Sequence, residues 1–431
     1  MFLIKNVKIK GMWGNKNIMA KMSPDSNIYI GKNGSGKTTF INLIKAVLTV
    51  DIIKLQELDF EYIKIFLVSE DKKQKTIIVS RDNDLSEKVI YKISNSTSTT
   101  IPFVSREILY QNRTTRVRSI KSIILELQDT IKGFLNISML SVSRELIADI
   151  DEEEELYRQT RYNRVGYIKS NPVDDTLSKL TSKLNSYQLQ LQSKANNLSV
   201  DFQKGVLNLI LYNKTMDTID KTFFEKVDYD EFSRNVKHAF DLLGMKSSGN
   251  TKINGHVNAI KTSVSKLKDS KELKINDVLP LSLYKRTKEI IKMSSNLDEN
   301  KIEIYSLIKT YEKVINDFFE DKSFSLNTSS DEPFDIILKR NKSALKICDL
   351  SSGEKQLLII FTEVLLHEKE RVVFLADEPE LSLHISWQRK LLNAIKEINP
   401  NAQLIIATHS PEVASSQPNS LIQMSSVFYD E

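Results

Sequence analysis

A glycine-rich stretch near the N-terminus, GKNGSGKT at residues 31–38, constrains the fold more than any other part of the sequence. It fits the spacing G-x-x-x-x-G-K-[ST], in which glycines let successive backbone N–H groups face phosphate oxygens. A short apolar run at 27–30 precedes it, and residues 39–50 carry apolar side chains at helical spacing. This order of strand, loop and helix predicts a phosphate-binding α/β core, because the helix N-terminus would point at the same anion.

The side chains of this loop have distinct expected roles beside a nucleotide. Lys37 would bring positive charge to the β- and γ-phosphates, and Thr38 would offer its hydroxyl to Mg²⁺. The expected nucleotide-binding set is Gly31, Asn33, Gly34, Ser35, Gly36, Lys37, Thr38 and Thr39.

Two further motifs follow apolar runs in the C-terminal part. Residues 371–379 read RVVFLADEP, and a buried strand ending in Asp377 would place this carboxylate beside the phosphate loop, where it can hold Mg²⁺. Glu378, the next residue, would polarise the attacking water. Residues 407–411 read ATHSP after another apolar run, so His409 is expected at the same sheet edge, near the γ-phosphate or the water.

Between these motifs the sequence pattern changes twice. Residues 60–93 contain three strand-like runs, which predict an antiparallel layer beside the nucleotide core. From 176 to about 319 the pattern is mostly helical, and a heptad-like spacing stands near each end. The two spacings comprise Leu177, Leu180, Leu184, Tyr187 and Leu191, and Ile304, Ile308, Tyr311, Ile315 and Phe318. They fit either an antiparallel hairpin that carries an insertion or two ordinary amphipathic helices packed on a domain.

A second small, polar, glycine-containing stretch, LSSGEKQ, occupies residues 350–356. GKNGSGKT, LSSGEKQ, LADEPELSLH and ATHS, in this order, resemble the ATP-binding-cassette (ABC) ATPases of the soluble RecF, structural-maintenance-of-chromosomes and OLD-like group. The LADEPELSLH form is especially similar to the ATPases of bacterial anti-phage systems such as Septu, PARIS, Gabija and retrons. The resemblance covers both end segments and says little about the helical middle.

This resemblance implies an α/β fold: an ABC-type P-loop NTPase head with a mixed core sheet and an antiparallel β layer, interrupted by a helical, coiled-coil-type insertion. The expected segments are residues 1–145 with the P-loop, 146–325 as the insertion, and 326–431 with the remaining motifs. ATP and Mg²⁺ are the implied cofactors, and ATP hydrolysis to ADP and phosphate is the implied reaction.

By the same resemblance LSSGEKQ is the cassette signature, which acts in trans on the ATP of a neighbouring subunit. The signature residues are Ser351, Ser352, Gly353 and Glu354, and the sequence departs from the commonest form by having Ser352 for glycine and Glu354 for glutamine. Residues 380–384 match the segment along the dimer interface. The implied assembly is a homodimer of heads or a higher homo-oligomer that closes on ATP and opens after hydrolysis through Glu378.

Two residues that the family usually has are not assigned by the sequence. Gln111 is a candidate for the lid glutamine, but its context, ILYQNR, does not match well. Trp13 lies ahead of the phosphate loop, where an indole could stack on adenine or simply pack at the edge of the core.

Basic residues gather in three stretches, 113–121, 158–164 and 252–274, and an acidic run at 151–155 adjoins the second. The Arg/Tyr mixture in 158–164 is of a kind that binds nucleic-acid backbones or stacks on bases. DNA or RNA contact and docking of a protein partner remain equal alternatives, since the net charge is only +5, from 61 basic and 56 acidic residues.

The composition favours a soluble cytoplasmic protein without membrane contact. The N-terminus lacks a signal-peptide pattern, the longest apolar runs are too short to span a bilayer, and Cys348 is the only cysteine. The sequence ends at residue 431, soon after His409, so a nuclease or toxin effector is expected to be a separately encoded partner.

Three functions agree with these features. The first is an ATP-gated sensor or regulator in anti-phage defence that controls the separate effector. The second is a RecF-like or SMC-like DNA-repair ATPase that acts on DNA. The third is a nucleotide-gated scaffold in which hydrolysis is incidental.

Overall fold

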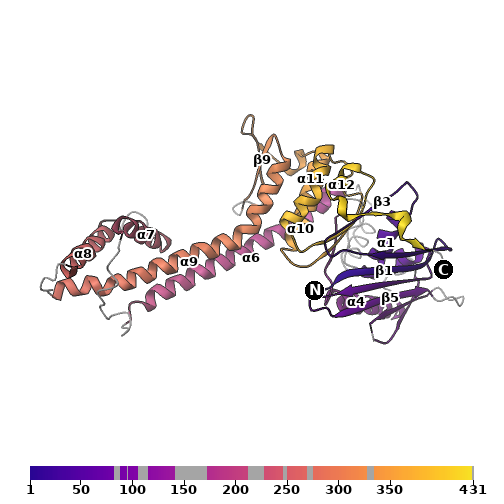
Figure 1. Cartoon of the computed structure of the whole chain (residues 1–431), viewed down its shortest axis with the longest axis horizontal. Helices are drawn as coiled ribbons and strands as arrows, with labels where there is room; N and C mark the ends of the chain where they lie inside the picture. Colours follow the sequence, from indigo (N-terminus) through magenta and orange to yellow (C-terminus); the bar gives the residue numbers. More distant parts are fainter. Residues whose placement is uncertain are drawn as a thin grey trace. The chain divides into compact units, whose positions relative to one another are not determined.

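The computed structural model describes residues 1–81, 88–94, 96–104, 115–140, 172–211, 228–245, 250–268, 275–327 and 334–429. The chain divides into two compact units, which we call the head (1–185 and 308–431) and the insertion (186–307). Figure 1 shows the head around α1 and the insertion around α7 and α8. Among the helices formed by the described residues, none combines the length and apolarity that crossing a bilayer requires.

A five-stranded parallel sheet forms the centre of the head. Its strand order is β14 (Leu421–Gln423), β3 (Ser26–Ile30), β13 (Gln403–Ala407), β12 (Val373–Asp377) and β8 (Ile137–Met139). All five residues of β13 are buried, as expected for a parallel strand covered on both faces. The α/β architecture is as predicted, with one refinement: the core sheet was expected to be mixed, and every described strand pair in it is parallel.

The predicted antiparallel layer is a seven-stranded sheet. Its order is β15 (Phe428–Tyr429), β2 (Lys16–Lys21), β1 (Leu3–Met12), β4 (Tyr62–Val68), β5 (Gln74–Arg81), β6 (Lys88–Ile93) and β7 (Thr99–Pro102). Side chains of β4 alternate between buried and half-buried along the strand, which is the period of a sheet with one covered face.

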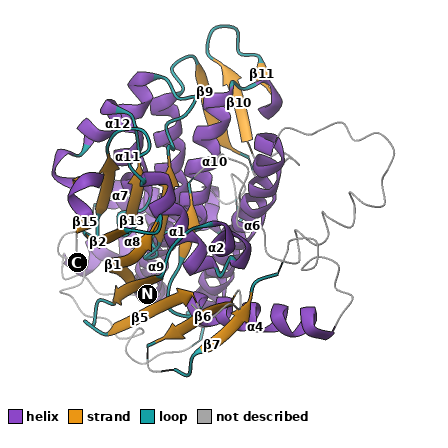
Figure 2. Cartoon of the chain, turned by 90° about the vertical axis from the view of Figure 1, so that its right-hand side faces the viewer, coloured by secondary structure: helices purple, strands orange, loops and turns teal. Residues whose placement is uncertain are grey.

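Helices connect and cover these sheets. Helix α1 (Lys37–Thr49) belongs to one apolar core with both sheets, through Phe40, Leu43 and Val47, and Figure 1 shows it beside β1. The other head helices are α2 (Ile52–Glu57), α4 (Thr115–Lys132), α10 (Ser352–Leu366), α11 (Ile385–Ile398) and α12 (Pro411–Ser416). A small antiparallel sheet of β9 (Lys322–Leu326), β10 (Phe334–Leu338) and β11 (Ala344–Leu345) lies at one end of the head in Figure 2.

Within the insertion, two long helices run antiparallel. They are the outer parts of α6 (Pro172–Asn208) and α9 (Ile275–Phe318). Gly205 of α6 lies against Met293 of α9. Further along the chain, the Leu211 carbonyl accepts a 3.1 Å hydrogen bond from Arg286. Later residues on the α6 side therefore meet earlier residues of α9, which is the order of an antiparallel pair. Of the two alternatives left open by the heptad-like spacing, the structure has the antiparallel hairpin.

Two shorter helices cap this hairpin. α7 (Tyr229–Leu242) and α8 (Asn250–Lys268) pack on α9 around an apolar cluster that includes Phe232, Ile260 and Tyr284. The insertion therefore has a core of its own, separate from the large core of the head.

Candidate functional site

The phosphate loop joins the carboxyl end of β3 to the start of α1, as predicted. Gly34 and Gly36 have φ angles of 73° and 95°, which lie in the left-handed region that glycine adopts without strain. Gly36 is the cap residue of α1, and it has no side chain that could bond to the first N–H groups of this helix. Those N–H groups are therefore left for an external acceptor, which a phosphate can be.

Lys37 folds back over the loop. Its ammonium group donates hydrogen bonds to the carbonyls of Gly31 at 2.8 Å and Lys32 at 3.3 Å. Burial lowers the pKa of Lys37, while the carboxylates of Glu378 and Asp377 act against this shift. The buried Ser35 hydroxyl has no hydrogen-bond partner among the described residues, which fits a loop whose polar groups serve a ligand.

A hydroxyl and a carboxylate meet beside the loop. Thr38 Oγ1 donates to Asp377 Oδ1 at 3.2 Å. Burial raises the pKa of Asp377, and the hydrogen bond from Thr38 and the charge of Lys37 oppose this shift. Both groups are hard oxygen ligands, so the pair fits Mg²⁺ held together with nucleotide phosphates.

The two predicted catalytic residues come together because β12 and β13 are paired in parallel, with Asp377 opposite Ala407. Glu378 and His409 follow these strand ends, and His409 Nε2 lies 3.7 Å from Glu378 Oε1. Glu378 has a φ of 49°, and its N–H donates to the Ala407 carbonyl at 2.8 Å. The side chains are 31% and 36% exposed, so water can reach the carboxylate.

A third acidic residue, Glu380, lies close to this site. From the sequence it was expected only as part of the 380–384 segment along the dimer interface, without a role of its own. Its side chain is only 6% exposed and accepts hydrogen bonds from the Thr408 hydroxyl and, at 3.3 Å, from the Ser410 N–H. Burial raises the pKa of Glu380. Thr408 and Ser410 flank His409, so Glu380 fixes the backbone that carries the histidine.

The residues predicted to form the signature lie at the start of α10. Ser351 caps the helix: its hydroxyl oxygen accepts from the Glu354 N–H at 3.3 Å, and Glu354 Oε2 accepts from the Ser351 N–H at 2.9 Å. Glu354 is buried and also forms a 2.7 Å ion pair with Lys322. Ser351 and Ser352 are exposed, whereas Gly353 is buried, so the two serines are the signature side chains that the surface presents.

The signature is packed against the segment that follows β12. A Cβ on Gly353 would lie 2.7 Å from the Ser382 carbonyl oxygen, so this contact requires glycine. Gln356 of α10 donates to the Pro379 carbonyl at 2.7 Å. A movement of the start of α10 would therefore displace the backbone next to Glu378.

Trp13 is placed next to the phosphate loop. A Cβ on Gly36 would lie 2.9 Å from the indole ring, and the Trp13 side chain is 41% exposed. Both base stacking and edge packing remain compatible with this position. Gln111 lies outside the described residues.

The three basic stretches are described only in part. Residues 158–164 and the acidic run 151–155 lie outside the described residues, as do 113–114 and 269–274. In the described remainder, Lys121 is buried on α4, and Lys266 of α8 forms a 2.7 Å ion pair with Asp277. These two lysines are therefore poorly placed to contact nucleic acid.

Comparison with known families and proteins identifies relatives of the chain. A family model described as "AAA ATPase domain" matches residues 1–414. "Retron Ec83 probable ATPase" of Escherichia coli is 24% identical over 221 residues, 45% of this chain and 38% of that protein. "Septu protein PtuA" of Bacillus thuringiensis is 31% identical over 118 residues, 24% of this chain and 30% of that protein. "Retron Vc95 probable ATPase" of Vibrio cholerae serotype O1 biovar El Tor is 25% identical over 224 residues, 46% of this chain and 42% of that protein.

The chain spans less than half the length of each of these relatives. Among solved structures, the Smc head domain of Pyrococcus furiosus with an extended coiled coil, bound to the C-terminal domain of ScpA, superposes with a TM-score of 0.42 at 15% identity, covering 96% of this chain and 92% of that one. The Smc head domain of Pyrococcus yayanosii with a coiled coil and joint gives 0.43 at 14% identity, covering 96% and 94%.

Proposed function

Since this chain belongs to the AAA ATPase domain family, we propose that it binds ATP with Mg²⁺ at the β3–α1 loop and hydrolyses it. The observation that carries this proposal is the meeting of Thr38 with Asp377 and of Glu378 with His409 at one sheet edge. Parallel strands bring such residues to the edge where nucleotides bind in α/β proteins.

Each side chain has a defined task in the proposed reaction. Lys37 and the N–H groups at the start of α1 bind the phosphates, and Thr38 and Asp377 are the protein ligands of Mg²⁺. When bound, Mg²⁺ supplies positive charge to the β- and γ-phosphate oxygens. Glu378 accepts a hydrogen bond from the attacking water and takes up its proton. His409, held by the Glu380 contacts, stands beside that carboxylate.

We further propose that ATP is bound between two chains, one contributing the phosphate loop and the other contributing Ser351 and Ser352 of the signature. The support is a contrast between two helix N-termini. Helix α10 begins with exposed serines and a capping box, whereas the first turn of α1 has no side-chain cap. A head dimer of this type contains two equivalent shared sites.

Mixing two inactive variants tests the shared site. Lys37→Ala removes one contribution and Ser351→Arg removes the other, and each variant alone should hydrolyse almost no ATP. In mixed dimers one of the two sites has both intact parts, so an equimolar mixture should regain roughly a quarter of wild-type ATPase activity.

The matched control mixes Lys37→Ala with the Lys37→Ala/Ser351→Arg double variant, in which no intact phosphate loop exists. It should stay inactive at the same concentrations. Differently tagged chains report whether mixed dimers form, and a first mixture that forms them without regaining activity contradicts the shared site.

At the level of the cell, we propose a regulatory ATPase of anti-phage defence that controls a separately encoded effector. The support is the similarity to retron and Septu proteins, which belong to systems of that kind. Cells that carry the natural gene cluster should lose phage resistance with Glu378→Gln and keep it with Glu368→Gln, an exposed glutamate beyond α10. Equal plaque counts for wild type and Glu378→Gln would contradict this role for hydrolysis.

A further inference from the structure

A second cavity of the head lies away from the phosphate loop. It has a volume of about 370 Å³ and is bounded by the end of α4, by β8, by the first turns of α6 and by the end of α10. Strand β8 pairs with Val373–Leu375, the first part of β12, whereas Asp377 ends that strand. The cavity is therefore separate from the ATP site proposed above.

The charged side chains around this cavity are mainly cationic. Lys132 comes from α4, Lys179 and Lys183 come from α6, and Glu363 and His367 come from α10. The two lysines of α6 are four residues apart and so lie on one face of the helix. Three lysines and one glutamate make this lining predominantly cationic, which favours an anionic ligand.

Among the described residues that line this cavity, the one carboxylate is already engaged by its neighbours. Glu363 Oε1 accepts a 2.6 Å hydrogen bond from the buried Ser138 hydroxyl and lies 3.6 Å from His367 Nε2. Burial alone would raise the pKa of Glu363, but the hydrogen bonds of His367 and Ser138 and the charge of Lys183 outweigh it, and the pKa is lowered. Glu363 thus stays ionised at neutral pH and holds the His367 ring at the cavity wall.

The remaining wall is apolar. Ile137, Met139, Leu180 and Leu366 line it between the charged groups. A volume of this size accommodates a small organic molecule, and a site with an apolar wall and a few convergent charges is typical of small-molecule binding. A bare inorganic anion would leave the apolar side uncovered.

We propose that this cavity is a second ligand site of the head, for a phosphorylated small molecule with an apolar or aromatic body. The phosphate would bind among Lys179, Lys183 and Lys132, with its oxygens as acceptors. The body would lie on Ile137, Leu180 and Leu366.

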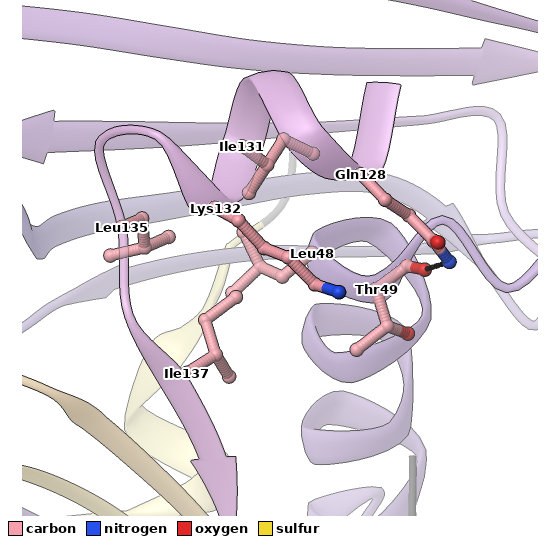
Figure 3. Close-up of a pocket in the computed structure, with 7 residues that line it drawn as sticks. All are labelled: Leu48, Thr49, Gln128, Ile131, Lys132, Leu135 and Ile137. Carbon is pink, nitrogen blue, oxygen red and sulfur yellow. Dashed lines mark hydrogen bonds between the residues drawn. The ribbon is translucent and has the colours of Figure 1, made fainter. Parts of the chain in front are cut away.

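Two structural elements connect this cavity with the proposed ATPase site. Helix α10 carries Glu363 and His367 near its end and the signature at its start, about 20 Å away. A smaller cavity of about 60 Å³, drawn in Figure 3, shares Lys132 and Ile137 with the first. There Gln128 of α4 donates to the Thr49 carbonyl at 2.8 Å, at the far end of the phosphate-loop helix.

Calorimetric titration of the full chain with Lys37→Ala tests the proposal, since this background disables the phosphate loop. The probes are AMP, ribose 5-phosphate and inorganic phosphate, with adenosine as the uncharged comparison. We expect AMP, whose base supplies the aromatic body, to bind at least tenfold more tightly than ribose 5-phosphate or inorganic phosphate, which lack one, and adenosine not to bind. Saturation should shift the imidazole NMR signals of His367, identified by their loss in His367→Asn.

Charge reversal at Lys183 locates the binding. Lys183→Glu should weaken binding at least tenfold, Lys183→Arg should largely retain it, and Lys194→Glu, an exposed site further along α6, should leave it unchanged. Both positions are exposed, so equal melting temperatures are expected for the three variants and should be checked. Lack of binding by all three phosphate probes, or binding that Lys183→Glu does not weaken, overturns the proposal. Because the Lys37→Ala background measures binding alone, this result is independent of whether the ATPase proposal holds.

Discussion

The phosphate loop and the predicted signature both lead into the N-terminus of a helix, but the first backbone N–H groups of the two helices are capped differently. Helix α1 begins at Gly36 in a left-handed conformation, and no side chain caps its first N–H groups. Helix α10 begins at Ser351 with a full capping box, and its carboxylate partner Glu354 is also paired with Lys322. An uncapped start can hold a phosphate by itself. At the capped start the Ser351 hydroxyl already donates to Glu354 Oε2 at 2.9 Å, so it must change partner before it can bind a phosphate that another element holds.

The largest expected effect of a single substitution is at the uncapped start. Lys37→Ala removes the buried cation between the Gly31 carbonyl and the strand-end carboxylates. Losing a charge-assisted hydrogen bond to phosphate should weaken ATP binding by about a hundredfold or more. Titration with a fluorescent ATP analogue measures this affinity.

Lys32→Ala is the matched control, because this lysine is an exposed neighbour in the same loop. It should change ATP affinity only slightly. If Lys37→Ala bound ATP as tightly as Lys32→Ala does, the uncapped start of α1 would not be the nucleotide site.

A smaller effect is expected at the capped start, and it should spare nucleotide binding. In Gly353→Ala the new methyl group would meet the Ser382 carbonyl oxygen, which is backbone and cannot easily move aside. We expect the free energy of unfolding to fall by about 1–3 kcal/mol. The fold-decrease in the ATP turnover rate should be larger than the fold-decrease in ATP affinity.

Gly255→Ala is the control for the Gly353 prediction. Gly255 lies in α8 with open space around its Cα, so alanine should stabilise the chain by about 0.5–1 kcal/mol. Denaturant titration and ATPase assays of both variants measure the contrast. A Gly353→Ala chain as stable and active as the wild type would show that the signature does not depend on this close contact.

The local sequence pattern was enough to predict those elements in which buried residues alternate with exposed ones or follow one another without interruption. The three strand-like runs predicted within residues 60–93 are strands β4, β5 and β6, and the buried strand predicted to end at Asp377 is β12. Strands β2 and β9 and the cap of α10 were missed, although Ser351 and Glu354 have capping-box spacing. Glu380 and the lysine-lined cavity depend on contacts between segments far apart in the chain, which no local pattern encodes.

The smallest expected effect concerns Glu380, whose carboxyl accepts hydrogen bonds on both sides of His409. In Glu380→Gln the amide oxygen can accept the same bonds from Thr408 and Ser410, so unfolding free energy should change by less than about 1 kcal/mol at low pH. The raised pKa of Glu380 means that the folded chain binds a proton more tightly than the unfolded chain does. Stability of the wild type relative to Glu380→Gln should therefore be greatest below the ordinary carboxyl pKa and fall as pH rises through the raised value.

Glu412 serves as the control, because its stability contribution should change with pH in the opposite direction. Its hydrogen bond with Arg389 lowers the pKa of Glu412, so the ionised form is favoured in the folded chain. Stability relative to Glu412→Gln should grow as pH rises towards neutrality and be lost as pH falls through the lowered value. Urea unfolding between pH 3 and pH 8 measures both differences. Parallel slopes for the two variants would mean that the Glu380 carboxyl is not buried between Thr408 and Ser410, and that His409 is held in another way.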